Sequence, residues 1–204
     1  MDIKRNQNIR DVYINRTINL INFFGWSLTL ISVSFSLLFL KIDEIASQKF
    51  HVFALFLLKL IQTFQISEII LGFVNTGSLP ILSIMQICGR LFTTWGFMKI
   101  DNSFVINFQI IFCWSLADSV RTLYYMMKDN QLLGWLRYNL FIVNYPIGFG
   151  SELFLMEMNI WFNNYNWEII YFLRFIEISF IIGFIFLYKH LLKNRKNYFK
   201  KKIN

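Results

Sequence analysis

Apolar residues in this chain occur in long uninterrupted runs rather than in the alternating patterns of amphipathic helices or half-buried strands. The first run, residues 17–40, contains no charged residue and exceeds the roughly 20 residues that cross a bilayer as a helix. Further runs occupy about residues 51–74, 79–98, 104–127, 136–161 and 167–192. These runs predict transmembrane segments.

The segments are expected to be helices. Backbone groups in lipid must be satisfied within each segment, and the runs lack the two-residue period of a membrane barrel. Short polar connectors join them, and no long linker or internal repeat separates the chain into parts. The pattern therefore predicts an all-α integral membrane bundle of six transmembrane helices, forming a single multi-pass domain over residues 1–204.

Composition agrees with this prediction, since 56% of the residues are hydrophobic and 16% are charged, against about a quarter charged in soluble domains. The two cysteines, Cys88 and Cys113, both fall inside apolar runs. Because they have no metal-ligand spacing and suggest no disulfide framework, we expect free buried thiols and no metal site.

The net charge of +8 comes largely from the two ends of the chain. Lysine and arginine favour the cytosolic side of a membrane, so both termini are predicted to be cytosolic, which requires an even number of spans. We interpret the basic ends as topology anchors that contact lipid headgroups, and expect no nucleic-acid partner. The basic residues are Lys4, Arg5, Arg10 and Arg16 at the N-terminal end, and Lys193, Arg195, Lys196, Lys200, Lys201 and Lys202 at the C-terminal end.

The chain ends in Lys201-Lys202-Ile203-Asn204. Lysines three and four residues from the carboxy terminus of a cytosolic tail resemble a dilysine retrieval signal, although a basic tail can produce this pattern by chance. Interpreted as a signal, it predicts the endoplasmic reticulum membrane.

Several polar and charged residues interrupt the apolar runs, where they are costly and usually face a bundle interior. Gln86 and Arg90 lie four residues apart on one helical face. Two oppositely charged pairs, Asp118 with Arg121 and Arg174 with Glu177, have the three-residue spacing of ion pairs along a helix and are expected to be structural. Lys59, Glu68, Arg137, Tyr138 and Asn139 complete the set.

Glu152 differs from these residues because no basic residue lies three or four positions away. Such an acid either pairs with another helix or remains available as a general acid or base. Tyr145 precedes it by seven residues on roughly the same helical face. Pro146, Gly148 and Gly150 lie nearby, and permit a local bend and the close approach of a substrate. The residues alone leave a structural and a catalytic interpretation open.

The stretch from Trp135 to Glu152 resembles the signature of the very-long-chain 3-hydroxyacyl-CoA dehydratases, the protein tyrosine phosphatase-like family. The family pattern, approximately W-x-R-Y-x-x-F-x-x-x-Y-P-x-G-x-x-x-E, is matched in full. Weaker blocks agree in the same order over nearly the whole chain. They are Gly25-Trp26, Gln86 with Arg90, Trp114-Ser115 through Arg121, Tyr125, and Tyr188 with His190.

The resemblance implies dehydration of 3-hydroxyacyl-CoA to trans-2-enoyl-CoA, the third step of fatty-acid elongation. It implies no cofactor, because CoA is part of the substrate. It also implies partnership with the condensing enzyme, ketoreductase and enoyl reductase of elongation. The family's catalytic Tyr and Glu correspond to Tyr145 and Glu152. The expected supporting residues are Gln86, Arg90, Asp118, Arg121, Arg137, Tyr138 and Gly148.

Dehydration needs a base for the C2 proton, a donor for the C3 hydroxyl and stabilisation of charge on the thioester oxygen. Glu152 is favoured as base and Tyr145 as donor, with the reverse assignment left open. Arg90, Arg121 or a backbone N–H freed by Pro146 are candidates for the oxygen.

The chain departs from the family pattern at a few positions, which puts supporting roles and chain-length preference in doubt. Asp118 stands where the family usually has Glu, Thr122 replaces a Tyr, Glu68 replaces a His and Gly89 replaces a Ser. The main alternative is accordingly an inactive acyl-CoA-binding or scaffolding subunit of the elongation complex.

Two further functions fit the residues less well. A small transporter or channel predicts broken helices in two corresponding halves, but only one Pro-Gly interruption lies deep in a run. A phosphatase of the cysteine type needs an arginine six residues after its cysteine, where this chain has Thr94 and Ser119.

Overall fold

The computed structural model describes residues 2–79, 81–99, 104–163 and 165–203, without the side chains of residues 2–14, 75, 76 and 201–203. Lys4, Arg5, Arg10 and the Lys201–Asn204 signal therefore lie outside the described side chains. All regular structure in the described part is helical. The helices are α1 (Asp2–Phe39), α2 (Glu44–Phe64), α3 (Ile66–Thr76), α4 (Ile81–Gly96), α5 (Phe104–Met126), α6 (Gln131–Phe162) and α7 (Trp167–Ile203).

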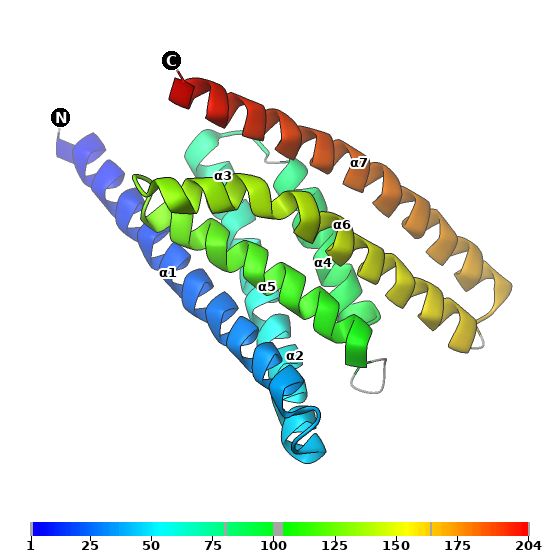
Figure 1. The fold of residues 1–204 in the computed structure, drawn as a ribbon. Coiled ribbons are helices and arrows are strands. Elements are labelled where there is room, and N and C mark those ends of the chain that lie inside the picture. Colours follow the sequence, from blue (N-terminus) through cyan, green and yellow to red (C-terminus); the bar gives the residue numbers. More distant parts are fainter. Residues whose placement is uncertain (1, 80, 100–103, 164, 204) are drawn as a thin grey trace.

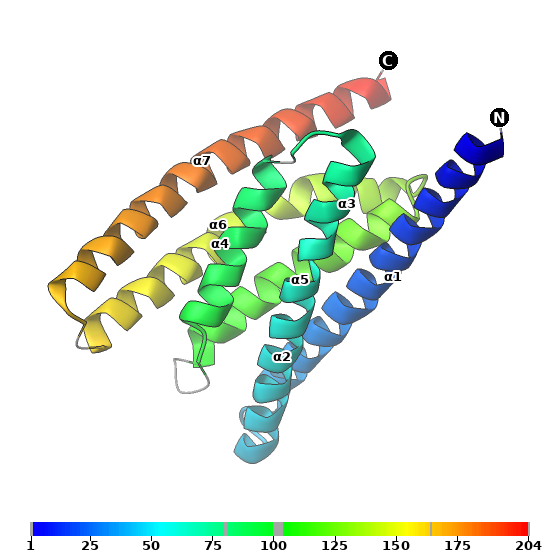
Figure 2. The same ribbon diagram turned by 180° about the vertical axis from the view of Figure 1, so that it is seen from behind.

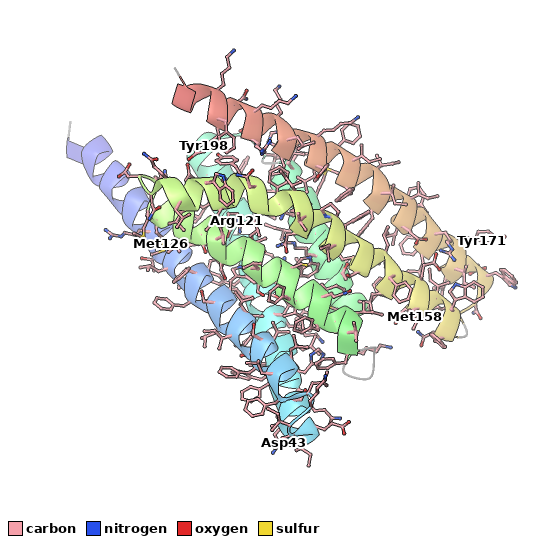
Figure 3. The ribbon with its side chains drawn as sticks, in the orientation of Figure 1. Asp43, Arg121, Met126, Met158, Tyr171 and Tyr198 are labelled. Atoms are coloured by element: carbon pink, nitrogen blue, oxygen red, sulfur yellow. The ribbon has the colours of Figure 1, made fainter. Side chains whose placement is uncertain are left out.

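The helices form one elongated bundle in which α1 begins and α7 ends at the same end (Figure 1). The α3–α4 and α5–α6 connections lie at that end as well, as the reverse view also shows (Figure 2). The α1–α2, α4–α5 and α6–α7 connections lie at the other end, where Asp43 is labelled in Figure 3. The chain thus passes along the bundle an even number of times.

Each predicted apolar run lies in a helical segment, but the boundaries differ at several places. The run at 51–74 is divided at Gln65 into α2 and α3, and the Gln65 N–H donates to the Ile61 carbonyl at 3.0 Å. α1 and α7 extend well beyond their apolar runs into the two basic ends of the chain. The basic ends are therefore helical continuations of the first and last runs.

The polar connectors contribute the residues that start the helices. Asp43 precedes α2, and its carboxylate accepts from the Ala46 N–H at 3.1 Å. Asn130 precedes α6, and its side-chain oxygen accepts from the Leu132 and Leu133 N–H groups at 2.9 and 3.3 Å. Both are N-caps, which satisfy N–H groups that have no partner within the helix. The cap at Asn130 starts α6 five residues before the predicted 136–161 run.

Three helical stretches in the described part of the chain are long and apolar enough to cross a membrane: Asn15–Phe39, Glu44–Val74 and Trp167–Lys200. Only 6% of the most apolar stretch of α7 is buried, with a mean hydropathy of 2.2. An exposed surface this apolar is stable in lipid and not in water. These three stretches are therefore typical of the helices of a membrane protein.

α4, α5 and α6 do not combine the length and the apolar character of these three stretches. α4 has 16 residues, which span only about 24 Å. α5 places polar residues in the interior, among them Asn107, Ser115, Asp118 and Thr122. Apolar side chains therefore cover the outside of the bundle, while much of the polar side-chain surface is enclosed.

A buried ion-pair network links α3, α4 and α5 around Asp118. The Asp118 carboxylate pairs with Arg90 of α4 and, at 2.8 Å, with Arg121 one turn along α5. Arg121 (labelled in Figure 3) also bonds both carboxylate oxygens of Glu68 at 3.0 and 3.1 Å. Asn22 of α1 donates to the same Glu68 at 2.7 Å. The predicted Asp118/Arg121 pair is thus confirmed, as part of a larger network.

A second ion-pair cluster lies near the opposite end, between α6 and α7. Arg174 pairs with Glu177 at 2.7 Å, which confirms the predicted pair, and also with Glu157 of α6. This cluster is partly exposed. The prediction for the cysteines is half wrong: both thiols are free, but Cys88 is exposed and only Cys113 is buried. Cys88 lies on the face of α4 that borders a cavity, where no neighbouring helix covers it.

The network predicts that Asp118→Ala strongly destabilises the protein, because it leaves the buried Arg90 without its counter-ion, while Arg121 keeps Glu68. Breaking a buried pair from one side costs about 3–5 kcal/mol. Thermal and chemical unfolding in detergent measures this change. The control is Glu177→Ala, which removes one carboxylate from the partly exposed Arg174 cluster and is expected to cost about 1 kcal/mol or less. Equal losses for both variants would contradict the special role of the Asp118 network.

Candidate active site

A partly open cavity of about 450 Å³ lies between α4, α5, α6 and α7. This volume falls within the range of small-molecule sites, which are mostly apolar with a few placed polar groups. The lining fits that description, since aromatic and aliphatic side chains make up most of it. Its polar and charged side chains include Gln86, Arg90, Asn144, Tyr145 and Glu152.

α6 brings Tyr145, Gly148 and Glu152 to this cavity together. Seven residues are almost two full turns, so the two side chains share a face about 10 Å apart along the helix axis. Gly148 lies between them, and a Cβ there would stand 3.3 Å from the Cys113 Cβ. The glycine thus allows α5 and α6 to approach closely at the level of the two functional groups.

The Glu152 carboxylate is buried and has a partner on another helix. The indole N–H of Trp114 on α5 donates to its Oε1 at 2.9 Å. The partner is therefore a neutral donor rather than a basic side chain, which answers the question that the sequence left open. A neutral donor orients a carboxylate without cancelling its charge, and leaves the second oxygen available.

Trp114 also contacts the ion-pair network. The guanidinium of Arg90 lies over the indole ring, with its Cζ 5.0 Å from the ring centroid. Arg90 lines the cavity, whereas its partner Asp118 and the adjacent Arg121 do not. The predicted residues are thus arranged in two layers. Gln86, Arg90, Tyr145, Gly148 and Glu152 border the cavity, and Asp118 and Arg121 lie behind Arg90.

Tyr145 is half-buried and stands next to aromatic residues of α7. Its ring lies 6.3 Å from the Phe184 ring, and Phe184 also stacks on Phe149 at 4.1 Å. The neighbouring residue on α6, Asn144, donates from its amide to the Cys113 carbonyl of α5 at 2.6 Å. These contacts position the phenol between α5 and α7.

Pro146 lies inside α6, where a bend was predicted, and it also changes the bonding of the helix to α7. A proline inside a helix lacks an N–H, and so the residue four positions earlier loses its donor. That residue is Ile142, whose carbonyl instead accepts from the Tyr188 hydroxyl of α7 at 3.3 Å. Pro146 itself borders a separate surface groove, and α6 changes direction along its length (Figure 1). The proline therefore bends α6 and ties it to α7, rather than freeing an N–H for the cavity.

Arg137 and Tyr138 lie outside the cavity. The Arg137 guanidinium is surrounded by the rings of Tyr124, Tyr125 and Tyr138, at 4.7, 4.5 and 5.2 Å, and it donates to the Tyr125 hydroxyl at 2.9 Å. Tyr138 stacks on Tyr198 of α7 at 4.3 Å, near the end of the bundle where Figure 3 labels Tyr198. The structure therefore separates these two predicted supporting residues from Tyr145 and Glu152.

Trp114, Asn144 and Phe184 line the cavity but are not among the site residues predicted from the sequence. Trp114 precedes Asp118 by four residues and so shares its helical face. This spacing from a charged residue could have indicated that Trp114 faces the interior of the bundle. The contact of Phe184 with Tyr145 depends on how α7 is rotated against α6, for which the sequence contains no comparable signal.

The fold and the site define a helical protein of membrane character that holds a carboxylate and a phenol in one mostly apolar cavity. A model of the protein tyrosine phosphatase-like protein family, PTPLA, matches residues 59–201, and the chain belongs to this family. The matched residues contain every cavity-lining group named above.

The similar proteins are all named as very-long-chain (3R)-3-hydroxyacyl-CoA dehydratases. The chain is 31% identical to a probable very-long-chain (3R)-3-hydroxyacyl-CoA dehydratase of Schizosaccharomyces pombe, over 71% of this chain and 74% of the relative. It is 29% identical to the rice dehydratase PASTICCINO 2B, over 72% of this chain and 68% of the relative. It is 28% identical to human very-long-chain (3R)-3-hydroxyacyl-CoA dehydratase 3, over 91% of this chain and 58% of the relative. No solved structure matches the chain.

Proposed function

We propose that this protein dehydrates 3-hydroxyacyl-CoA thioesters to trans-2-enoyl-CoA. The observation that carries the proposal is the convergence of Tyr145 and Glu152 on one cavity. The description of the relatives as dehydratases of very-long-chain (3R)-3-hydroxyacyl-CoA supports it. The mostly apolar walls suit an acyl chain, which gains free energy when it leaves water.

In the proposed mechanism, Glu152 removes the C2 proton of the thioester and Tyr145 donates its proton to the C3 hydroxyl. The C2–H electron pair forms the C2–C3 double bond, and the C3–O bond breaks to release water. The Trp114 N–H donates to one oxygen of Glu152 and so orients the carboxyl group, which leaves the second oxygen for the C2 proton. The proton on Glu152 then returns to Tyr145 through the released water, which restores both groups.

Arg90 is the proposed stabiliser of negative charge on the thioester oxygen. It is the cation of the ion-pair network that borders the cavity. Arg121, the other candidate, is bonded to Glu68 and Asp118 behind Arg90. A guanidinium has five N–H donors, so Arg90 can pair with Asp118 and still donate to a substrate oxygen. A fixed cation in a site shielded from water is effective in stabilising such charge.

We further propose that the chain crosses the membrane six times with both termini in the cytosol, at the endoplasmic reticulum. The even number of passes and the basic helical extensions of α1 and α7 support this topology. A 3-hydroxyacyl-CoA is formed by reduction of a 3-ketoacyl-CoA, and the enoyl-CoA formed by its dehydration is reduced in turn. The proposed partners are therefore the condensing enzyme, ketoreductase and enoyl reductase of fatty-acid elongation.

Removing either proposed catalytic group is expected to abolish most of the activity. For Tyr145→Phe and Glu152→Gln, kcat for 3-hydroxyacyl-CoA should fall by roughly 10²–10⁴-fold, the usual contribution of a general acid or base. Formation of the enoyl-CoA by purified, folded protein measures this.

The matched controls are Tyr171→Phe and Glu157→Gln, which make the same chemical changes outside the cavity and should retain activity. A wild-type protein that binds acyl-CoA without turnover would instead favour the alternative of an inactive binding or scaffolding subunit.

Trp114 is expected to act through Glu152 as a positioning residue. Trp114→Phe keeps an aromatic ring but removes the N–H donor, so kcat should fall about 10- to 100-fold, as for loss of a hydrogen bond to a charged group. KM should change little, since the acyl chain keeps its contacts. The control Trp95→Phe changes an exposed tryptophan and should have no effect.

A double-mutant cycle separates this role from general packing. In the Glu152→Gln background, Trp114→Phe should cause little further loss of kcat, because the group it orients is already absent. The same fold loss in both backgrounds would show that the indole contributes through packing alone.

The proposed topology predicts that tags at both termini are accessible on the cytosolic face of sealed membranes. Protease treatment of intact microsomes should remove both tags, and a glycosylation site inserted in the α1–α2 connection at residues 40–43 should be used on the lumenal side. Protection of one terminus alone would require an odd number of spans and contradict the topology.

A further inference from the structure

A second, basic groove of about 500 Å³ lies between the start of α6 and the end of α7. It combines three cationic side chains with two aromatic rings and an amide. Arginine and lysine bind phosphate oxygens, and aromatic rings stack on nucleobases. The lining residues are Trp135, Asn139, Arg195, Lys196, Phe199 and Lys200.

The positive charge of this groove is not neutralised by the helices that form it. Arg195 donates to the Asn139 amide oxygen at 2.9 and 3.2 Å, which is a neutral partner. The sequence has no acidic residue from Gln131 to Ser151 or after Glu177. Lys196 and Lys200 are exposed. The charges are therefore available to an anionic ligand.

The walls of the groove are held together by aromatic packing. Tyr138 stacks on Tyr198 at 4.3 Å, and a Cβ at Gly134 would lie 2.1 Å from the Tyr198 hydroxyl. A larger residue at position 134 would therefore displace the Tyr198 ring from its place against Tyr138. Arg195 also lies over the Phe199 ring, at 5.3 Å. The groove is thus built before a ligand arrives, which lowers the entropic cost of binding.

The two helices that form the groove, α6 and α7, also line the cavity, together with α4 and α5. Along α6, Asn139 in the groove and Tyr145 in the cavity are about 9 Å apart, and along α7, Leu187 and Arg195 are about 12 Å apart. The pantetheine arm of CoA has the length of about four extended residues, roughly 14 Å. A thioester at Tyr145 would therefore place the phosphates of its CoA near the basic side chains.

We propose that this groove binds the phosphoadenosine diphosphate head of the CoA thioester, with Lys196, Lys200 and Arg195 contacting the phosphates and Trp135 stacking on the adenine. The assignment rests on the proposed dehydratase function and adds the subsite that recognises CoA. An anionic lipid headgroup shares the phosphate chemistry, although it has no base for Trp135.

The test uses the full-length protein in detergent and the variant Lys196→Ala/Lys200→Ala, which changes exposed side chains only. KM for 3-hydroxyacyl-CoA should rise about tenfold or more, the range for loss of charge-assisted hydrogen bonds. With the matching 3-hydroxyacyl-pantetheine, which lacks the nucleotide, wild type and variant should have the same KM. An equal loss with both substrates, or no change with either, would overturn the proposal.

The matched control is Lys189→Ala/Lys193→Ala, which removes the same charge from exposed positions of α7 that do not line the groove. It should leave KM for the CoA thioester unchanged. A rise equal to that of the groove variant would mean that the general charge of α7 attracts the substrate, and the groove assignment would be wrong.

Binding of CoA itself, measured by calorimetry, separates this inference from the proposed function. If wild type has no turnover but binds CoA about tenfold more tightly than the groove variant, the subsite stands and the dehydratase assignment fails. If both bind CoA equally, the subsite fails regardless of turnover. Nanodiscs with and without phosphatidylserine test the lipid alternative. A groove variant that loses only its response to that lipid, with unchanged affinity for CoA, would assign the groove to lipid.

Discussion

The structure depends on the pairing of charges that cannot be left alone in an interior surrounded by apolar surface. Asp118 is the centre of this pairing, because Arg90 and Arg121 share its carboxylate. Arg121 in turn connects to Glu68 of α3. Unpaired, any of these ions would carry a large desolvation cost. Helices distant in sequence are therefore fixed in rotation and depth relative to one another, which apolar packing against lipid does much less specifically.

This pairing has a direct consequence for the cavity. Arg90 belongs to the network but also lies against Trp114, and Trp114 holds Glu152. The two acids nevertheless have opposite environments. Asp118 faces two cations, whereas Glu152 accepts from one neutral indole. The network thus provides rigidity, and Glu152 is connected to it through Trp114.

The features that the sequence predicted are those that depend on one helix at a time. The apolar runs predicted the helices, and three-residue spacing predicted the Asp118/Arg121 and Arg174/Glu177 pairs. The placement of Tyr145 and Glu152 on one face follows in the same way from helical geometry. The contacts that were missed join separate helices. Those between Trp114 and Glu152, and between Glu68 and Arg121, depend on how each helix is rotated in the bundle. Arg137 was expected to support substrate binding, and the structure places it in a tyrosine cluster near the start of α6, outside the cavity.

The break in the backbone bonding of α6 explains how one helix can serve two purposes. Pro146 leaves the Ile142 carbonyl without a helical donor, and the Tyr188 hydroxyl of α7 replaces it. The segment after the proline directs Gly148 and Glu152 toward α5 and the cavity. The segment before it follows the end of α7, where Tyr138 meets Tyr198. A straight helix of 32 residues would hold a single direction over about 48 Å. The bend lets Glu152 face the centre of the bundle while the first segment of α6 packs against the end of α7, and the Tyr188 contact keeps the two segments in a fixed relation.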